Sequence, residues 1–392
     1  MTIFEALQRF LNTSFPLMPP RLPEAERKQA LQTLHALRQA YEMLSQTTLY
    51  EVLSQEEGRS LARMALALSE KENVDEEFRW VPHLVLANVA NAVPGALAGL
   101  YPQLLRQDFS YGMDALFREA DVETRDQLLT WIENEERTVY SRDQLLSCVA
   151  WINDEVVRAA FRRWRDYPPA WALYLPRPVE WFTLVAGWEL TAEGGRRDLY
   201  YSTCYGLIPS STQPSEQIEP VETVLPHEDH CGWCQRPMVV LFDLHLSDPR
   251  LNFLSLHGER LRIAICPNCS PQGYQVFTDV KMQGGSQWSP LSGTPPKELD
   301  LYPDSVLEEM TLPSHPLVLG PQRRTPFISE GSHLGGCPEW VQYPEYPQCP
   351  QCQRTMTFLG QYEPKDVSYI EGIFYAFLCT GCLKATTVYQ QT

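Results

Sequence analysis

The chain has 392 residues, which at about 150 residues per domain predicts two or three domains. Hydrophobic residues make up 44% and charged residues 21% of the sequence, an ordinary globular balance that excludes global disorder. The formal net charge is −17 and both halves of the chain are acidic, which argues against a nucleic-acid-binding protein and favours a basic protein partner.

Neither a secretory signal nor a membrane-spanning segment is expected. Residues 1–5 provide no basic region that leads into an apolar stretch and a cleavage site. The longest apolar stretch, residues 81–100, is interrupted by proline, histidine and asparagine, whereas a spanning helix needs about 20 apolar residues. We therefore expect a cytoplasmic protein without a membrane partner.

Residues 1–166 have the apolar periodicity of consecutive helices and predict an all-α domain. Ser141 and Asp154 are expected to cap the last two helices. The sequence Asn153–Ala160 resembles the second helix of a HEAT-type repeat, which implies a HEAT-like array of stacked helix pairs; a compact bundle is the alternative. The expected helices are one containing Ile3, Leu7, Phe10 and Leu11, and those at Leu31–Leu44, Glu56–Ser69, Val81–Ala92, Ala96–Leu105, Tyr111–Ala120, Glu123–Asn134, Gln144–Ile152 and Glu155–Arg165.

After residues 167–169 (Tyr-Pro-Pro) the pattern changes to that of strands and loops, so the fold class is α+β multidomain. Trp181–Leu190 and Asp198–Leu207 predict two strands of a hairpin whose turn lies at Glu193–Gly195. We expect residues 167–226 to form this hairpin and a linker, 227–283 a first zinc-ribbon-like unit, 284–326 a Pro-rich linker, and 327–392 a second zinc-ribbon-like unit.

The metal prediction depends on four Cys-x-x-Cys pairs in the second half. Thirty-one residues separate the first two pairs and twenty-six the last two. A Cys-x-x-Cys knuckle turns two thiolates toward one ion, and two knuckles complete a closed tetrahedral site with no open position for substrate. We therefore expect two structural zinc ions. The ligands are Cys231, Cys234, Cys266 and Cys269 for one ion, and Cys349, Cys352, Cys379 and Cys382 for the other.

The two zinc-ribbon-like units have the features of a duplication. The segments that begin at Cys231 and Cys349 share the pattern C-x-x-C-Q-R-x-M-x-x-L. In each unit one strand is expected to leave the first knuckle, a second to return to the second knuckle, and a third to follow it. These strands are Met238–Leu246, Leu261–Ile265 and Tyr274–Val280 in one unit, and Met356–Tyr362, Phe374–Leu378 and Thr386–Gln390 in the other.

Other roles suit these residues less well. A redox dithiol at Cys231 and Cys234 belongs at a strand-to-helix junction, whereas a strand is expected here, and disulfides do not suit a chain without a signal peptide. His227 or His230 could replace one thiolate, although solvated loop histidines are commoner. Three cysteines have no partner at ligand spacing, and the first of them lies in an apolar helix: Cys148, Cys204 and Cys337.

The stretch His333–Gln342 and the two knuckles after it give the order G-G-x-P-x-W-x-Q, C-x-x-C, M-x-F-L-x-Q and C-x-x-C. Over residues 327–392, with a fainter echo at 227–280, this order resembles the bacterial YwqG-like family and the C-terminal zinc region of programmed cell death protein two. The resemblance implies a β-rich, zinc-assisted protein-binding module of the kind found in dedicated chaperones or immunity proteins. It does not extend to the helical half.

Signatures of common enzymes, such as G-x-S-x-G, a Walker A loop or H-E-x-x-H, are missing from the sequence. Two charged clusters read more simply as solvated faces than as sites, and they comprise Glu133, Glu135 and Glu136, and Arg158, Arg162, Arg163 and Arg165. Aromatic residues are expected to pack between the helical and β halves, with any exposed part as the candidate binding surface: Trp164, Trp171, Tyr174, Trp181 and Trp188.

The sequence therefore predicts a non-enzymatic, zinc-stabilised interaction protein: an adaptor, a dedicated chaperone or an immunity protein with a basic partner. One alternative is an enzyme with a site between the helical and β halves that uses His333, Glu339 or His257. Another is nucleic-acid binding by the zinc ribbons, although few basic residues lie near the knuckles: Arg236, Arg354 and Lys384. The identity of the partner and the oligomeric state are left open.

Overall fold

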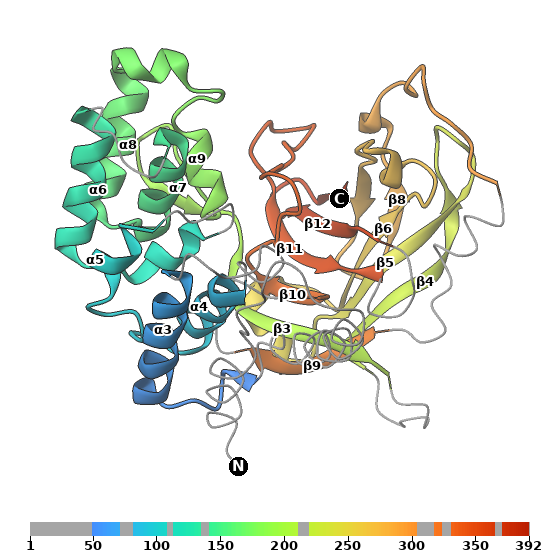
Figure 1. The fold of residues 1–392 in the computed structure, drawn as a ribbon. Coiled ribbons are helices and arrows are strands. Elements are labelled where there is room, and N and C mark those ends of the chain that lie inside the picture. The colour runs from blue at the N-terminus through green and yellow to red at the C-terminus, as the bar shows by residue number, and fades with distance from the viewer. Residues whose placement is uncertain are drawn as a thin grey trace, which may run out of the picture. The chain divides into compact units, whose positions relative to one another are not determined.

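The structure is a computed structural model that describes residues 49–70, 81–107, 113–134, 141–210, 219–303, 317–323, 331–364 and 371–391. The two helices expected before residue 45 lie outside these ranges. The chain divides into two compact units, Met1–Arg196 and Arg197–Thr392 (Figure 1). The first is mainly helical and the second contains a large sheet, so the mixed α and β fold class is confirmed.

The described part of the first unit follows the predicted order of helices, with two exceptions. Residues 96–100 form turns and only a short helix follows, because Gly95 and Gly99 adopt positive φ angles of 74° and 78°. The segment expected at 111–120 contains a 3₁₀ helix instead of an α-helix. The observed elements are α3 (Gln55–Ser69), α4 (Val81–Ala92), α5 (Tyr101–Leu104), η3 (Asp114–Glu119), α6 (Val122–Asn134), α7 (Arg142–Ile152), α8 (Glu155–Asp166), η4 (Ala170–Tyr174) and α9 (Trp181–Val185).

The junction between α7 and α8 forms as its capping residues predict. Ser141 and Gln144 make a reciprocal capping box at the start of α7. Asn153 ends α7 in the left-handed conformation with a φ of 50°. Asp154 then caps α8, because its Oδ1 accepts the Val157 N–H at 2.9 Å. The buried face of α8 consists of Val157, Ala160, Phe161 and Trp164.

Three of the aromatic residues expected between the two halves, Trp164, Trp171 and Trp188, pack inside the first unit instead, whereas Tyr174 is exposed. Phe161 of α8 lies edge-on to Trp164 and Trp188, with ring centroids 5.3 and 5.7 Å apart, and Trp164 lies 5.6 Å from Trp171. The Trp188 Nε1–H donates to the Ala150 carbonyl at 3.0 Å. All of these residues belong to the first compact unit, which ends at Arg196.

The predicted hairpin turn is present, but its strands are shorter than expected. Residues 181–185 form the short helix α9 instead of a strand. Gly187, with a positive φ of 73°, separates this helix from β1 (Trp188–Leu190). β1 pairs with β2 (Arg196–Asp198) in a two-stranded sheet. Arg162 fixes the turn to α8, because its Nη2 donates to the Gly194 carbonyl at 2.6 Å.

Among its described residues, the second unit forms one sheet of eleven strands in the order β6-β5-β4-β9-β3-β10-β11-β12-β13-β7-β8 (Figure 1). The strands are β3 (Tyr201–Pro209), β4 (Val221–His230), β5 (Pro237–His245), β6 (Arg260–Ile265), β7 (Thr278–Val280), β8 (Ser286–Trp288), β9 (Leu317–Arg323), β10 (His333–Gly336), β11 (Thr357–Tyr362), β12 (Ile373–Cys379) and β13 (Lys384–Gln390).

The two zinc-ribbon-like regions are therefore parts of one sheet and not separate units. β13 of the second region pairs with β7 of the first, and the Lys384 Nζ lies 2.5 Å from the Asp279 Oδ1. β4, β8 and β9 come from segments expected to be linkers, so the linkers are shorter than predicted. A single hydrophobic core connects the regions, since it includes Leu241 and Ile263 as well as Leu359 and Leu378.

No helix within the described ranges is long and apolar enough to span a lipid bilayer.

Candidate metal centres

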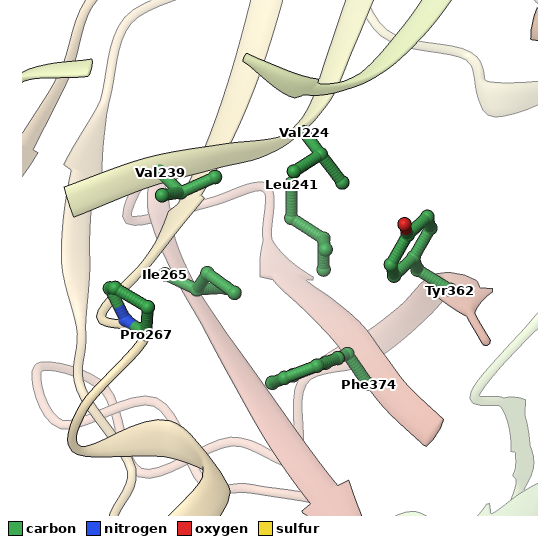
Figure 2. Close-up of a pocket in the computed structure, with 7 residues that line it drawn as sticks. All are labelled: Val224, Val239, Leu241, Ile265, Pro267, Tyr362 and Phe374. Carbon is green, nitrogen blue, oxygen red and sulfur yellow. The ribbon is translucent and has the colours of Figure 1, made fainter. Parts of the chain in front are cut away.

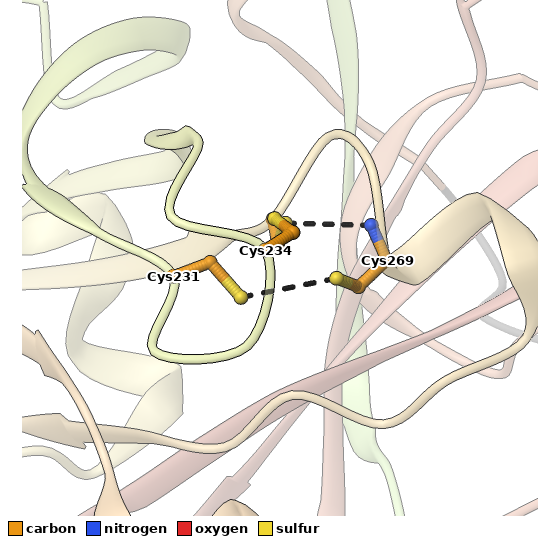
Figure 3. A group of neighbouring side chains, drawn as sticks. Cys231, Cys234 and Cys269 are labelled. Atoms are coloured by element: carbon orange, nitrogen blue, oxygen red, sulfur yellow. Dashed lines mark hydrogen bonds between the residues drawn. The ribbon is translucent and has the colours of Figure 1, made fainter. Parts of the chain in front are cut away.

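The structure brings the eight predicted cysteine ligands together in two groups of four. Within each group all four Sγ atoms lie within 4.8 Å of one another. In the first group the Sγ of Cys231 is 3.8 Å from that of Cys269 (Figure 3). The Sγ of Cys234 is 3.4 Å from that of Cys266. Four thiolates at about 2.3 Å from one tetrahedral ion are about 3.8 Å apart. Each group can therefore hold one metal ion without rearrangement.

The first knuckle has the same backbone conformation in both groups, which accounts for the shared motif. The glutamine after the second cysteine, Gln235 or Gln353, has a left-handed φ of 60° in both copies. Its N–H donates to the carbonyl of the first cysteine, at 2.9 and 2.8 Å. Its side-chain amide donates to the carbonyl three residues earlier, at 3.0 and 3.2 Å. The N–H of the first cysteine donates to the carbonyl of the motif arginine at 2.9 Å in both copies.

The apolar motif positions also have equivalent environments. Met238 and Met356 are each 1% exposed and pack against the cysteines of their own group. Leu241 and Leu359 both lie where the register of the antiparallel pair shifts, and both reach the common core. The duplication therefore extends from the sequence to the turn, the buried methionine and the β-bulge.

The electrostatics of the groups favour a bound cation. Hydrogen bonds from Cys234 and the other thiols lower the pKa of Cys231, while the proximity of Cys231 raises the pKa of Cys266. In the second group the Arg354 backbone N–H and guanidinium lower the pKa of Cys352 to about 6. Some thiols thus lose their proton readily, and the resulting negative charge opposes ionisation of the neighbouring thiols. A bound cation removes this repulsion, so that all four thiols can ionise.

The two nearby histidines are not among the converging side chains. The metal-sized groups within the described residues contain cysteine alone. The His227 Nδ1 accepts the Asp229 N–H at 2.9 Å, and burial lowers the pKa of this imidazole. His230 is exposed at the end of β4. The three other cysteines, Cys148, Cys204 and Cys337, are buried away from both groups.

The three residues considered for an enzyme lie in different parts of the second unit's described sheet and loops. His333 is fully buried on β10, and its Nδ1 lies 2.7 Å from the Gly335 carbonyl. The backbone of Glu339 is held by Gln361 and Tyr375. His257 is exposed and precedes β6. In the sheet order four strands lie between β6 and β10, which contains His333: β5, β4, β9 and β3.

His333 should make the second unit sensitive to acid. Burial, helped by the charge of Arg323, lowers its pKa from 6.5 to about 3. Below pH 6.5 the unfolded chain therefore binds a proton that the folded chain does not, and stability falls by about 1.4 kcal/mol per pH unit. Between pH 6.5 and 5.0 the wild type should lose about 2 kcal/mol more than His333→Asn, measured by urea unfolding of metal-loaded protein. Equal losses would contradict this assignment.

The arginine cluster of α8 has partners within the protein, as expected of a solvated face. Arg158 pairs with Glu155 at 2.8 Å, and Arg163 pairs with Glu133. The Arg165 Nη1 donates to the Thr191 carbonyl at 2.8 Å, and Arg162 holds the hairpin turn described above. Glu135 and Glu136 lie outside the described residues.

Three exposed apolar side chains follow α8 in the chain. Tyr167, Leu173 and Tyr174 are 80%, 82% and 88% exposed, and we call them the 167–174 patch. The neighbouring Trp164 and Trp171 are only 2% and 5% exposed. Tyr174 belongs to the candidate surface expected from the sequence, whereas Leu173 and Tyr167 do not, although Pro168 directly follows Tyr167.

The second unit also contains an apolar hollow where β4, β5 and β6 face β11 and β12 (Figure 2). No charged side chain lines this hollow. The lining residues are Val224, Val239, Leu241, Ile265, Pro267, Tyr362 and Phe374. The hydroxyl of Tyr362 is the one side-chain polar group among these lining residues.

Comparison with known proteins gives one informative relative. The "Uncharacterized protein YpfL" of Salmonella typhimurium is 33% identical to this chain over 356 residues, which cover 88% of the chain and 79% of the relative. No family model matches the chain, so the resemblance to the YwqG-like family and to programmed cell death protein two stays a prediction. No solved structure matches it either.

Proposed function

The chain belongs to the same family as YpfL of Salmonella typhimurium, and we propose that it is a non-enzymatic protein-interaction protein whose sheet is stabilised by two zinc ions. Zinc is the ion that closed four-thiolate sites built from two knuckles most commonly hold. Full thiolate ligation leaves no open position for substrate, so the metal has a structural role. Two such ions help to stabilise a unit whose strands come from distant parts of the chain.

The 167–174 patch is the observation that carries the interaction function. Three large apolar side chains exposed by four-fifths or more within eight residues of the chain are typical of a surface that a partner covers. Tyrosine is among the residues that dominate binding energy at such surfaces. The short junction between α7 and α8 supports a HEAT-like arrangement of helix pairs as the scaffold that presents this patch.

We propose that the partner is a basic protein and not a nucleic acid. At a net charge of −17 the chain repels a phosphate backbone at long range and attracts a cationic protein. Cysteines that serve as thiolate ligands or stay free suit the cytoplasm, where thiols are kept reduced. An adaptor, a dedicated chaperone and an immunity protein against a basic toxin would each bind a basic protein in this way.

The test is quantitative binding to a partner identified by pull-down and mass spectrometry. The variant Tyr167→Ser/Leu173→Ser/Tyr174→Ser should bind that partner about 100-fold more weakly, because the anchors of the contact are lost. Its fold should be unchanged, since all three side chains are exposed. Leu301→Ser, at a position that is 62% exposed in the other unit, is the matched control and should bind like the wild type.

The salt dependence of the same interaction tests the charge argument. Association should slow between 0.1 and 1 M salt, as the Debye length falls from about 10 to about 3 Å, with a smaller effect on dissociation. Tight binding of DNA or RNA at physiological salt would contradict the proposed class of partner.

A further inference from the structure

The first metal centre is covered by residues 286–302, which we call the cover segment. The indole of Trp288 lies on the first knuckle so closely that a Cβ on Gly232 would be 2.7 Å from the ring. The backbone N–H of Trp288 donates to the Oδ2 of Asp229 at 2.6 Å, and Asp229 lies two residues before Cys231. The Trp233 Nε1–H donates to the Gly293 carbonyl at 2.9 Å. The knuckle is therefore shielded on its outer side.

The second knuckle of the first centre binds the other end of the cover segment. The Asn268 amide, between Cys266 and Cys269, donates to the Asp300 carbonyl at 2.8 Å and accepts the Tyr302 N–H at 2.8 Å. Gln272 donates to the same Asp300 carbonyl at 2.8 Å. Both knuckles are thus connected to one segment, and three of the four ligands are buried.

The second centre is more open. Cys352 and Cys382, one from each knuckle, are both half-buried, whereas Cys234 alone is half-buried in the first centre. The arginine of the shared motif also has different surroundings in the two centres. Arg236 donates to the Tyr302 carbonyl of the cover segment at 3.2 Å. Its counterpart Arg354 lies beside the Cys352 thiol and so near the second knuckle that a Cβ on Gly381 would be 2.7 Å from its Nη2.

We propose that the two centres have diverged in role: the first is a permanent structural site, and the second is a thiol switch from which a peroxide releases the metal. This inference rests on the proposed zinc ligation. Because Cys352 and Cys382 are only half-buried, a peroxide can reach them. The guanidinium of Arg354 lies against the second knuckle, at Gly381, and provides positive charge close to these thiols.

The chemistry balances with hydrogen peroxide as the oxidant. A thiolate of the second centre attacks one peroxide oxygen, the O–O bond breaks, and a sulfenic acid and hydroxide form. A second thiolate of the same centre attacks that sulfur and displaces hydroxide, so one disulfide forms. In total the two sulfurs lose two electrons, which reduce the peroxide. The two hydroxide ions are protonated by the solvent and become water. The zinc ion, left with two thiolates, dissociates.

The test follows zinc release from the full-length protein with a colorimetric chelator while hydrogen peroxide is added. One zinc per chain should be released at least 10-fold faster than the other. Mass mapping of alkylated protein after the first release should find a disulfide among Cys349, Cys352, Cys379 and Cys382, with Cys231, Cys234, Cys266 and Cys269 still reduced. Total zinc is measured after full denaturation of the same sample.

Two variants separate the roles of the cover segment and of Arg354. Asn268→Ala should accelerate release of the slow zinc at least 10-fold, because it removes two of the hydrogen bonds that hold one end of the cover segment. Arg354→Ala, at an exposed position, should slow release of the fast zinc several-fold without changing the total. Equal release rates, or disulfides that form first in the Cys231 group, would overturn the inference while total zinc stayed at two. A total near zero would instead overturn the zinc ligation itself.

Discussion

Cys379→Ser should remove one of the two metal ions and unfold much of the second unit while the helices of the first unit stay folded. Cys379 ends β12, whose buried residues belong both to the core around the second centre and to the common core of the sheet. Loss of a metal site is among the most destabilising single changes, and we expect a cost of at least about 4 kcal/mol. Cys266→Ser should act in the same way on the first centre.

The measurement combines metal analysis with thermal unfolding followed by circular dichroism. The helical signal should persist in Cys379→Ser after the transition of the second unit has moved to lower temperature. Cys204→Ala is the matched control, because Cys204 is 1% exposed in β3 but belongs to neither group. It should cost about 1 kcal/mol and keep two metal ions. Wild-type stability and two bound ions in Cys379→Ser would show that this thiol is not a ligand.

Gly335→Ala should destabilise the second unit by more than about 3 kcal/mol. Gly335 has a positive φ of 70°, and an added Cβ would overlap the carbonyl oxygen of Thr203 on β3 and lie 2.7 Å from the ring of Phe253. Since the first obstacle is backbone in a paired strand, it cannot move aside without breaking the pairing of β3 with β10. These strands lie between the two metal-binding regions in the sheet order.

Gly273→Ala separates the cost of the clash from the cost of the backbone conformation. Gly273 has a similar φ of 81°, but nothing lies within 4 Å of its would-be Cβ. It should lose only about 1 kcal/mol. Urea unfolding of both variants gives the comparison. Equal losses would mean that β3 and β10 do not approach each other as closely as the structure shows.

The features predictable from sequence are those set by nearby residues. The spacing of each knuckle determines which thiols face one another, and the glutamine and arginine of the motif form local hydrogen bonds. The helix caps at Ser141 and Asp154 likewise depend on residues three positions apart. For these elements a short window of sequence contains the whole interaction.

The features that could not be predicted depend on distant pairing. β7 and β13 are about a hundred residues apart in the chain, and nothing in either strand specifies the other. β9 lies in a segment expected to be a linker, because its Gly320 and Pro321 resemble loop residues. The cover segment lies in the same expected linker, and its contacts with Asn268 and Gln272 use backbone groups that every sequence has.

Elemental analysis of full-length protein, purified under reducing conditions without added metal, tests the central claim most directly. Each group of four thiols is arranged for one ion, so we expect close to two zinc ions per folded chain. Acid should release them, because protons compete for the thiolates. A zinc content near zero in protein that is reduced and folded by circular dichroism would contradict the account.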